Sequence, residues 1–200
     1  MSDDWNDYAD GWDGNSDVRS YADQAFAALD AFAGITGGGW QDKRVLDFGC
    51  GTGLLSEQLS PHVKEVVAVD TSDRMIAVLQ DKALPGVRAL HADILDSSTR
   101  EAGGGLTSFD LICASSVCGF LPDYSGAVAE LAGLLNRGGL FVQWDWLATD
   151  DGGSGLTEQQ VGDALRGAGL EPVRVEKAFA MEAGGQRMPV LMGAAVRAAG

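Results

Sequence analysis

The stretch Val45-Leu46-Asp47-Phe48-Gly49-Cys50-Gly51-Thr52-Gly53 decides the fold that we expect for this chain. Its first residues are apolar enough for a buried strand, its three glycines mark a tight turn, and residues 54–59 have the apolar spacing of a helix. A strand, a glycine-rich turn and a helix leave backbone N–H groups unpaired at the positive end of the helix dipole, where a ligand can bind. The stretch therefore predicts the first strand–turn–helix of a Rossmann-like sheet.

The glycine spacing argues against a dinucleotide as that ligand. The dinucleotide pattern is G-x-G-x-x-G, whereas this turn has glycines at 49, 51 and 53, and Leu54 stands where the last glycine belongs. Asp47 would bring negative charge close to a pyrophosphate, but it suits a ligand that has a cationic amino group. A nicotinamide-dependent oxidoreductase and a glycine turn without any ligand remain the alternatives.

Two further apolar runs also end in an acidic residue. Residues 66–69 lead into Asp70 and Thr71, and residues 87–92 lead into Asp93. A carboxylate at the tip of the second strand of a βαβ unit accepts hydrogen bonds from both hydroxyls of a bound ribose. A carboxylate after the third strand can reach the exocyclic amine of an adenine. Three strands that end in three acids predict a nucleoside site.

In order and spacing, the glycine turn, Asp70 and Asp93 resemble the motifs of the class I S-adenosylmethionine-dependent methyltransferases of the small stand-alone type. Residues 108–116, 121–123 and 134–142 resemble that family's fourth strand, the loop after it and the approach to the fifth strand. The resemblance is close over residues 40–147 and looser elsewhere. It implies an α/β fold with a Rossmann-like doubly wound seven-stranded sheet, mostly parallel with an antiparallel C-terminal strand.

The resemblance also implies a cofactor, S-adenosyl-L-methionine, and the residues that bind it. The glycine turn would lie along the methionine moiety, Asp70 would hold the ribose, and Asp93 and Ile94 would contact the adenine. The Ala114 carbonyl would accept from the amino group, and Ser72 and Met75 would flank the adenine. The expected cofactor-binding set is Asp47, Gly49, Gly51, Gly53, Asp70, Thr71, Met75, Asp93, Ile94 and Ala114.

The expected methyl acceptor is a small molecule that binds at the loops after the fourth and fifth strands. Many relatives have a histidine pair where this chain has Gly119-Phe120, so the resemblance assigns no catalytic residue. Trp144-Asp145-Trp146 has two interpretations: an aromatic wall with a carboxylate for the acceptor, or core tryptophans with a solvated aspartate between them. The candidate acceptor-binding residues are Arg19, Tyr21, Ser115, Phe120, Tyr124, Trp144 and Asp145.

Composition restricts the partners. The chain has 14 basic and 29 acidic residues, a formal net charge of −15, which repels a phosphate backbone and argues against a nucleic-acid acceptor. The sequence lacks a long apolar run and a basic leader, so we expect a cytoplasmic protein, a monomer or homodimer, that spans no membrane. The three cysteines fit no metal spacing and are expected to be reduced and mostly buried, so no metal site is predicted.

The expected organisation is a single methyltransferase domain over residues 1–200. It comprises an N-terminal helical lid at 1–36, a cofactor-binding core at 40–147, and a helix with a β-hairpin at 156–200. Trp5, Tyr8 and Trp12 have helical spacing and serve either as part of that lid or as an ordinary packing face. The predicted function is methyl transfer to a small molecule by in-line displacement, mainly through proximity and orientation. The alternatives are a non-catalytic cofactor-binding or regulatory protein of the same fold, and a protein methyltransferase.

Overall fold

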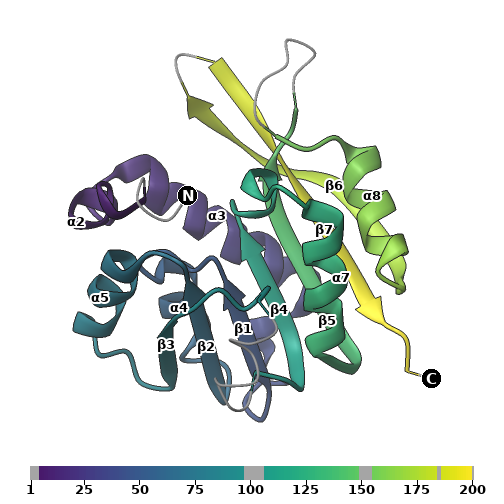
Figure 1. Ribbon diagram of the computed structural model, residues 1–200, viewed down its shortest axis with the longest axis horizontal. Coiled ribbons are helices and arrows are strands. Elements are labelled where there is room, and N and C mark those ends of the chain that lie inside the picture. Colours follow the sequence, from purple (N-terminus) through teal and green to yellow (C-terminus); the bar gives the residue numbers. More distant parts are fainter. Residues whose placement is uncertain (1–4, 97–105, 149–154, 184–185, 200) are drawn as a thin grey trace. The chain divides into compact units, whose positions relative to one another are not determined.

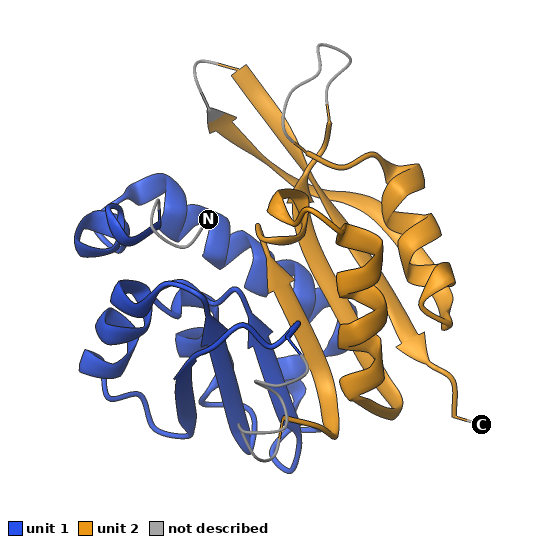
Figure 2. Ribbon diagram, viewed as in Figure 1, with its two compact units in different colours: residues 1–104 blue, residues 105–200 orange. Residues whose placement is uncertain are grey.

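The computed structural model describes residues 5–96, 106–148, 155–183 and 186–199. Its strands form a seven-stranded sheet in the order β3-β2-β1-β4-β5-β7-β6. The chain divides into two compact units, residues 1–104 and 105–200 (Figure 2). The expected fold class is confirmed: the sheet is mostly parallel, and β7 near the C-terminus is its antiparallel strand.

The first unit alternates strands and helices (Figure 1). Strand β2 pairs in parallel with β1 on one side and with β3 on the other, which places the three acidic strand ends along one edge. Its elements are α2 (Ala9–Trp12), α3 (Ser16–Ala33), η1 (Ile35–Gly37), β1 (Arg44–Phe48), α4 (Leu54–Leu59), β2 (Glu65–Asp70), α5 (Asp73–Asp81) and β3 (Val87–His91).

Local signals set the helix ends in this unit. The Asn15 side chain accepts the Asp17 N–H at the start of α3, and left-handed Gly34 ends that helix. Ser72 caps α5 in the same way, because its hydroxyl accepts the Met75 N–H. Trp5, Tyr8 and Trp12 were expected on a single helix, but a turn at residues 7–8 precedes the short α2.

The second unit holds the other four strands. Strand β4 is parallel to β5, whereas β7 lies between β5 and β6 and runs antiparallel to both. Pro172 lies in β6, which is an edge strand and tolerates a residue that has no N–H to donate. The elements are β4 (Phe109–Ser115), η2 (Cys118–Phe120), α7 (Tyr124–Leu134), β5 (Leu135–Trp146), α8 (Glu158–Gly167), β6 (Leu170–Ala183) and β7 (Gln186–Arg197).

Helix α8 and strand β7 fit together because of one glycine. Thr157 and Gln160 form a capping box that begins α8, as their spacing predicts, and Val161 is buried in its first turn. Gly193 of β7 faces this turn, where an added Cβ would lie 2.4 Å from Val161 Cγ1 and 3.3 Å from Gln143 Cγ. The missing side chain at this position lets α8 pack on the sheet.

Among the described residues, no helix is long and apolar enough to cross a membrane. Cys113 and Cys118 are buried and Cys50 is half-buried, and all three have free thiols.

Candidate functional site

The glycine turn after β1 has the backbone conformation that its sequence predicts. Gly49 and Cys50 donate their N–H groups to the Val69 carbonyl of β2, at 2.9 and 3.0 Å. Gly53 has a φ of +80°, and an added Cβ there would lie 2.3 Å from Leu79 Cδ1 of α5. The turn therefore requires glycine at Gly53 both for its left-handed conformation and for the approach of α5.

The Asp70 carboxylate holds this turn in place. Its Oδ2 accepts the Gly51 N–H at 2.8 Å, and its Oδ1 accepts the Ser72 N–H at 2.8 Å. The side chain is half-buried, and each carboxylate oxygen keeps a second lone pair beyond these backbone bonds. The geometry joins Asp70 to the glycine turn and leaves the carboxylate able to accept the hydroxyls of a ribose.

Asp47 lies at the same edge, but its side chain is buried beneath the turn. It is 1% exposed, and its Oδ2 accepts the Ser56 hydroxyl of α4 at 2.6 Å. Burial raises the pKa of Asp47 to about 6, and the negative charge of Asp70 adds to the increase, whereas the Ser56 hydrogen bond opposes it. Asp47 therefore joins β1 to α4 and lies in contact with no solvent.

The residues expected around the adenine follow the ends of β2 and β3, and Met75 lies in the first turn of α5. Met75 and Ile94 are buried, while Thr71 and Asp93 are exposed. Asp93 Oδ1 accepts the Leu95 N–H at 3.0 Å, which closes the turn after β3.

The N-terminal segment contacts the glycine turn directly. An added Cβ at Gly51 would lie 3.7 Å from Trp12 Nε1 and 3.9 Å from Met75 Sδ, so this glycine is at the base of a cradle that Trp12 and Met75 flank. Such a cradle suits a flat or extended ligand, and the residues present therefore fit a nucleoside cofactor. Trp12 also contacts Trp5 and Tyr8, with ring centroids 6.0 and 6.5 Å away.

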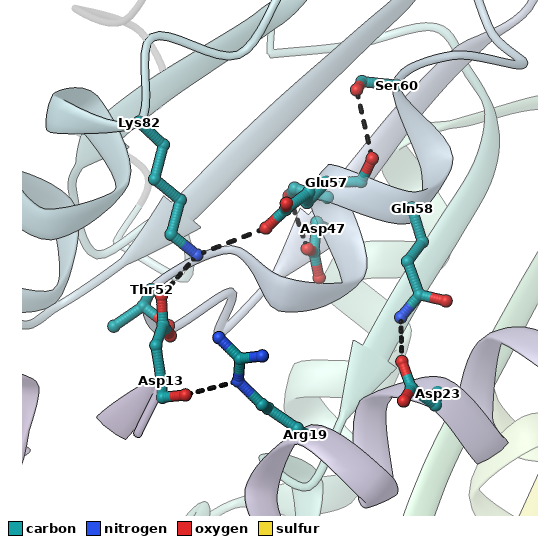
Figure 3. Close-up of polar contacts among 10 residues, drawn as sticks. Asp13, Arg19, Asp23, Asp47, Thr52, Glu57, Gln58, Ser60 and Lys82 are labelled. Atoms are coloured by element: carbon teal, nitrogen blue, oxygen red, sulfur yellow. Dashed lines mark hydrogen bonds and ion pairs between the residues drawn. The ribbon is translucent and has the colours of Figure 1, made fainter. Parts of the chain in front are cut away.

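A cluster of polar side chains around Asp13 strengthens this contact, and Figure 3 shows it. Asp13 accepts the Thr52 hydroxyl at 2.5 Å and pairs with Lys82 Nζ at 2.7 Å. Lys82 also lies 3.5 Å from Glu57 of α4. We call Asp13, Thr52, Glu57 and Lys82 the Asp13 cluster; it joins the N-terminal segment to the glycine turn, α4 and the end of α5.

Two further contacts bind the same segment to α5. Asn6 Nδ2 donates to Asp73 at 2.9 Å and its Oδ1 accepts the Ser72 hydroxyl at 2.5 Å, and Asp10 pairs with Arg74 at 2.6 Å. Of the two predicted acceptor-binding residues in this unit, Arg19 is exposed and donates to the Asp13 carbonyl, whereas Tyr21 is buried in α3.

The remaining predicted residues belong to the second unit. Ala114 is fully buried in β4, and Ser115 ends that strand half-buried. Ser116 follows with a φ of +56° and donates its N–H to the Trp144 carbonyl at 2.7 Å. Phe120 is 42% exposed, which is unusual for so large an apolar side chain.

The Trp144-Asp145 pair fits neither interpretation completely. Trp144 is 0% exposed and therefore belongs to the core, but Asp145 is 2% exposed and is no solvated loop residue. Asp145 Oδ1 accepts the Gly119 N–H at 2.8 Å, and its Oδ2 accepts Gln143 Nε2 at 2.8 Å. The Tyr124 hydroxyl in turn donates to Gln143 Oε1 at 2.7 Å. Burial raises the pKa of Asp145 to about 7 against these hydrogen bonds and one from the Cys118 backbone.

The sequence analysis missed several residues, both around the glycine turn and around Asp145. Gln143 had a usable signal, because it is two residues before Asp145 on a strand and so shares its face. Asp13, Thr52 and Lys82 had none, since only the packing of α5 brings them together.

Comparison with known proteins gives a family match for part of the chain. The sequence pattern of the methyltransferase domain family matches residues 46–143, just under half of the chain, which run from β1 into β5. The match includes the glycine turn, Asp70, Tyr124 and Gln143, but it excludes the N-terminal segment and Asp145. Residues 46–143 of the chain are therefore similar to a methyltransferase domain.

Named relatives of this methyltransferase domain share part of the chain. An uncharacterized methyltransferase of Schizosaccharomyces pombe is 36% identical over 107 residues, which cover 49% of this chain and 37% of that protein. A ubiquinone biosynthesis O-methyltransferase of Aromatoleum aromaticum is 30% identical over 114 residues, 56% of this chain and 45% of the relative. The chain thus matches less than half the length of either relative.

Among solved structures, the N-methyltransferase NodS of Bradyrhizobium japonicum in complex with S-adenosyl-L-homocysteine has the same fold. The TM-score is 0.64 at 20% identity, and the match covers 92% of this chain and 88% of NodS. This likeness concerns the fold and supports the α/β architecture of the sheet.

Proposed function

We propose that this protein binds S-adenosyl-L-methionine and transfers its methyl group to a small molecule. The observation that carries the proposal is the Asp70 carboxylate, bonded at once to Gly51 and Ser72, beside a cradle that Trp12 and Met75 flank. This arrangement places a hydroxyl-accepting group beside an indole and a thioether, in a chain whose residues 46–143 match the methyltransferase domain family.

Each group of residues has a distinct task in this proposal. In the first unit, Asp70 holds the ribose, the glycine turn lies along the methionine moiety, and Thr71, Asp93 and Ile94 contact the adenine. When bound, the cofactor supplies a methyl group on a positively charged sulfur. The protein's part is to bind, orient and exclude water, so no strong acid–base pair is needed.

Charge supports a small acceptor over a nucleic acid. The net charge of −15 repels a phosphate backbone. The relative from Aromatoleum aromaticum is named as an O-methyltransferase of ubiquinone biosynthesis, which supports an acceptor of low molecular weight.

Titration calorimetry tests the proposal. The wild-type protein should release or absorb heat with S-adenosyl-L-methionine, and Asp70→Asn should weaken the affinity by about tenfold or more, because an amide can replace only one of the two acceptors. Asp81→Asn, on the exposed end of α5, is the matched control and should bind as the wild type does.

No heat with the wild-type protein, or equal affinity in Asp70→Asn, would remove the cofactor assignment. Binding without transfer of a labelled methyl group to any small molecule would instead favour the non-catalytic alternative, and label in protein would favour a protein methyltransferase.

A further inference from the structure

The hydrogen bonds among Tyr124, Gln143 and Asp145 can run in only one direction while Asp145 is ionised. A carboxylate only accepts hydrogen bonds, so the group of Gln143 that faces Asp145 Oδ2 at 2.8 Å must be its amide nitrogen. The amide oxygen then faces Tyr124, and because it too only accepts, the Tyr124 hydroxyl must donate to it at 2.7 Å. Chemistry, rather than the placement of hydrogens, fixes this polarity.

The direction of this chain determines what Tyr124 offers to a ligand. The single hydroxyl hydrogen of Tyr124 is committed to Gln143, so the lone pairs of Oη are left to accept a hydrogen bond. Tyr124 begins α7, in the connection that leaves the carboxyl end of β4, and it is only half-buried, whereas Gln143 and Asp145 are buried. In α/β sheets, ligands bind outside the carboxyl ends of the strands.

We propose that Tyr124 Oη accepts a hydrogen bond from the methyl acceptor, and that the acceptor therefore presents an O–H or N–H group at the atom that is methylated. This inference rests on the proposed methyltransferase function and narrows its substrate class to alcohols, phenols and amines. Tyr124 is the residue that touches the acceptor, while Gln143 and Asp145 are positioning residues that act through it.

The hydrogen bond to Tyr124 strengthens as the reaction proceeds. The lone pair of the acceptor forms a bond to the methyl carbon, the carbon–sulfur bond breaks with its electrons going to sulfur, and the acceptor's proton leaves to water. While the new bond forms, the O–H or N–H becomes more acidic, so its hydrogen bond to Tyr124 Oη is stronger than in the ground state. Such a difference raises the rate as well as the affinity.

Protonation of Asp145 removes the constraint on the direction of the hydrogen bonds among Tyr124, Gln143 and Asp145. A neutral carboxylic acid has an O–H to donate, so Gln143 can turn its amide around and donate to Tyr124 instead, which frees the Tyr124 hydrogen. The pKa of Asp145 is raised to about 7 by burial, so this reversal falls near neutral pH.

The titratable neighbours of Asp145 are Cys118 of η2 and Tyr124 of α7, whose pKa values are raised by burial first and by the Asp145 charge as well. Leu191 on β7, which pairs with Asp145, has no charge.

Nuclear magnetic resonance tests the polarity without any substrate. With ¹³C-tyrosine labelling, the Tyr124 Cζ signal, identified by its loss in Tyr124→Phe, should shift with a midpoint near pH 7. In Asp145→Asn the amide nitrogen would donate to Gln143 and reverse the chain, so the signal should stay at its low-pH position at every pH. A signal that does not titrate in the wild type, or that titrates unchanged in Asp145→Asn, would overturn the proposed polarity.

Methyl transfer from labelled cofactor to a panel of phenols, alcohols, amines, carboxylates and thioethers tests the substrate class. We expect label only on phenols, alcohols or amines, and a loss of about 10- to 100-fold in kcat/KM in Tyr124→Phe, the range expected for one hydrogen bond to a developing charge. Above pH 7, Asp145→Asn should lose a similar factor, and the double variant should be no worse than Tyr124→Phe alone. Ser125→Ala, on the exposed face beside Tyr124, is the control.

The two proposals fail in different ways. All of these variants should bind S-adenosyl-L-methionine as the wild type does, and loss of cofactor binding by the wild type would count against the proposed function. Normal cofactor binding with transfer to carboxylates or thioethers, with transfer to none of the panel, or with full activity in Tyr124→Phe would overturn the role of Tyr124 alone.

Discussion

Asp47 and Asp145 are buried aspartates near the ends of two strands, and they have different structural roles. Each is almost fully buried and has a pKa raised first of all by loss of solvent. Asp47 has one hydroxyl partner, from Ser56, and this bond joins β1 to α4. Asp145 accepts N–H groups from Gly119, Gln143 and the Cys118 backbone, and the bonds from Gly119 and Cys118 fix the loop after β4. The first carboxyl is part of the framework, and the second sets the direction of a hydrogen-bonded chain.

The raised pKa of Asp47 predicts a specific pH dependence of stability. Between its unfolded pKa of 3.8 and its folded pKa of about 6, the folded state binds more protons, so the free energy of unfolding falls as the pH rises through this window and is level above it. We expect Asp47→Asn to lack this fall, and to be more stable relative to the wild type at pH 8 than at pH 4 by on the order of 2 kcal/mol.

Urea unfolding of both proteins at pH 4, 5, 6, 7 and 8 is the measurement. The other carboxyl groups contribute equally to both proteins, so the difference isolates residue 47. A difference in unfolding free energy that is constant with pH would mean that Asp47 is ionised at its ordinary pKa in the folded protein.

At the scale of elements, two close approaches depend on residues that lack a side chain. Gly53 lets Leu79 of α5 pack against the glycine turn, and Gly193 lets Val161 of α8 pack against β7. Gly53 belongs to the glycine turn that the sequence predicts, whereas Gly193 lies within a strand. For both, the close approach of a helix is visible only once the helices are in place.

We predict that Gly193→Ala lowers the free energy of unfolding by about 2 kcal/mol, because an added Cβ would lie 2.4 Å from Val161 Cγ1 in a packed core. Gly133→Ala is the matched control: an added Cβ in this turn of α7 has nothing within 4 Å, so stability should stay unchanged or rise by up to about 1 kcal/mol. Denaturant melts measure both.

Val161→Ala should restore part of the loss when combined with Gly193→Ala. Strictly additive effects of the two substitutions would show that the clash is relieved elsewhere.

The N-terminal segment is the second element with a testable role, as a lid over the cradle at Gly51. Asn6, Asp10 and Asp13 each bind it to α5 or to the end of that helix. Cofactor binding should slow hydrogen exchange of the amides in residues 5–14. Asp13→Asn, which removes the charge paired with Lys82, should speed that exchange several-fold and weaken cofactor affinity, because Trp12 is less well held on the glycine turn.

Asp17→Asn in the exposed first turn of α3 serves as the control. Exchange in residues 5–14 that is already slow in the free protein, and does not change with cofactor or in Asp13→Asn, would make Trp5, Tyr8 and Trp12 an ordinary packing face.

At the scale of the molecule, the sequence predicts the framework well because its signals are local. Apolar runs that end in Asp47, Asp70 and Asp93 mark three strand ends, and the Thr157–Gln160 spacing marks a helix start. Such local signals do not predict contacts between distant segments. The bond from Tyr124 to Gln143 and the pairing of Asp13 with Lys82 depend on helix packing, which no local pattern encodes.

Strand lengths show the same limit. The alternating apolar pattern of the sequence predicts hairpin strands over residues 172–180 and 189–197, but β6 and β7 are longer, Leu170–Ala183 and Gln186–Arg197. The added residues include one alanine, Ala183, and charged side chains of weak strand preference, and they are extended because each strand hydrogen-bonds the other.

The place of β7 between β5 and β6 has a consequence for synthesis on the ribosome. Strands β5 and β6 are translated first. Strand β5 can pair with β4 on one side, but its other edge and the edge of β6 that pairs with β7 have no partner until residues 186–197 have left the exit tunnel. At elongation rates of about 5 to 20 residues per second, both strands wait for seconds with unpaired edges. The nascent chain of the second unit is therefore most exposed to aggregation and to chaperones in this interval, which ends when β7 inserts between β5 and β6.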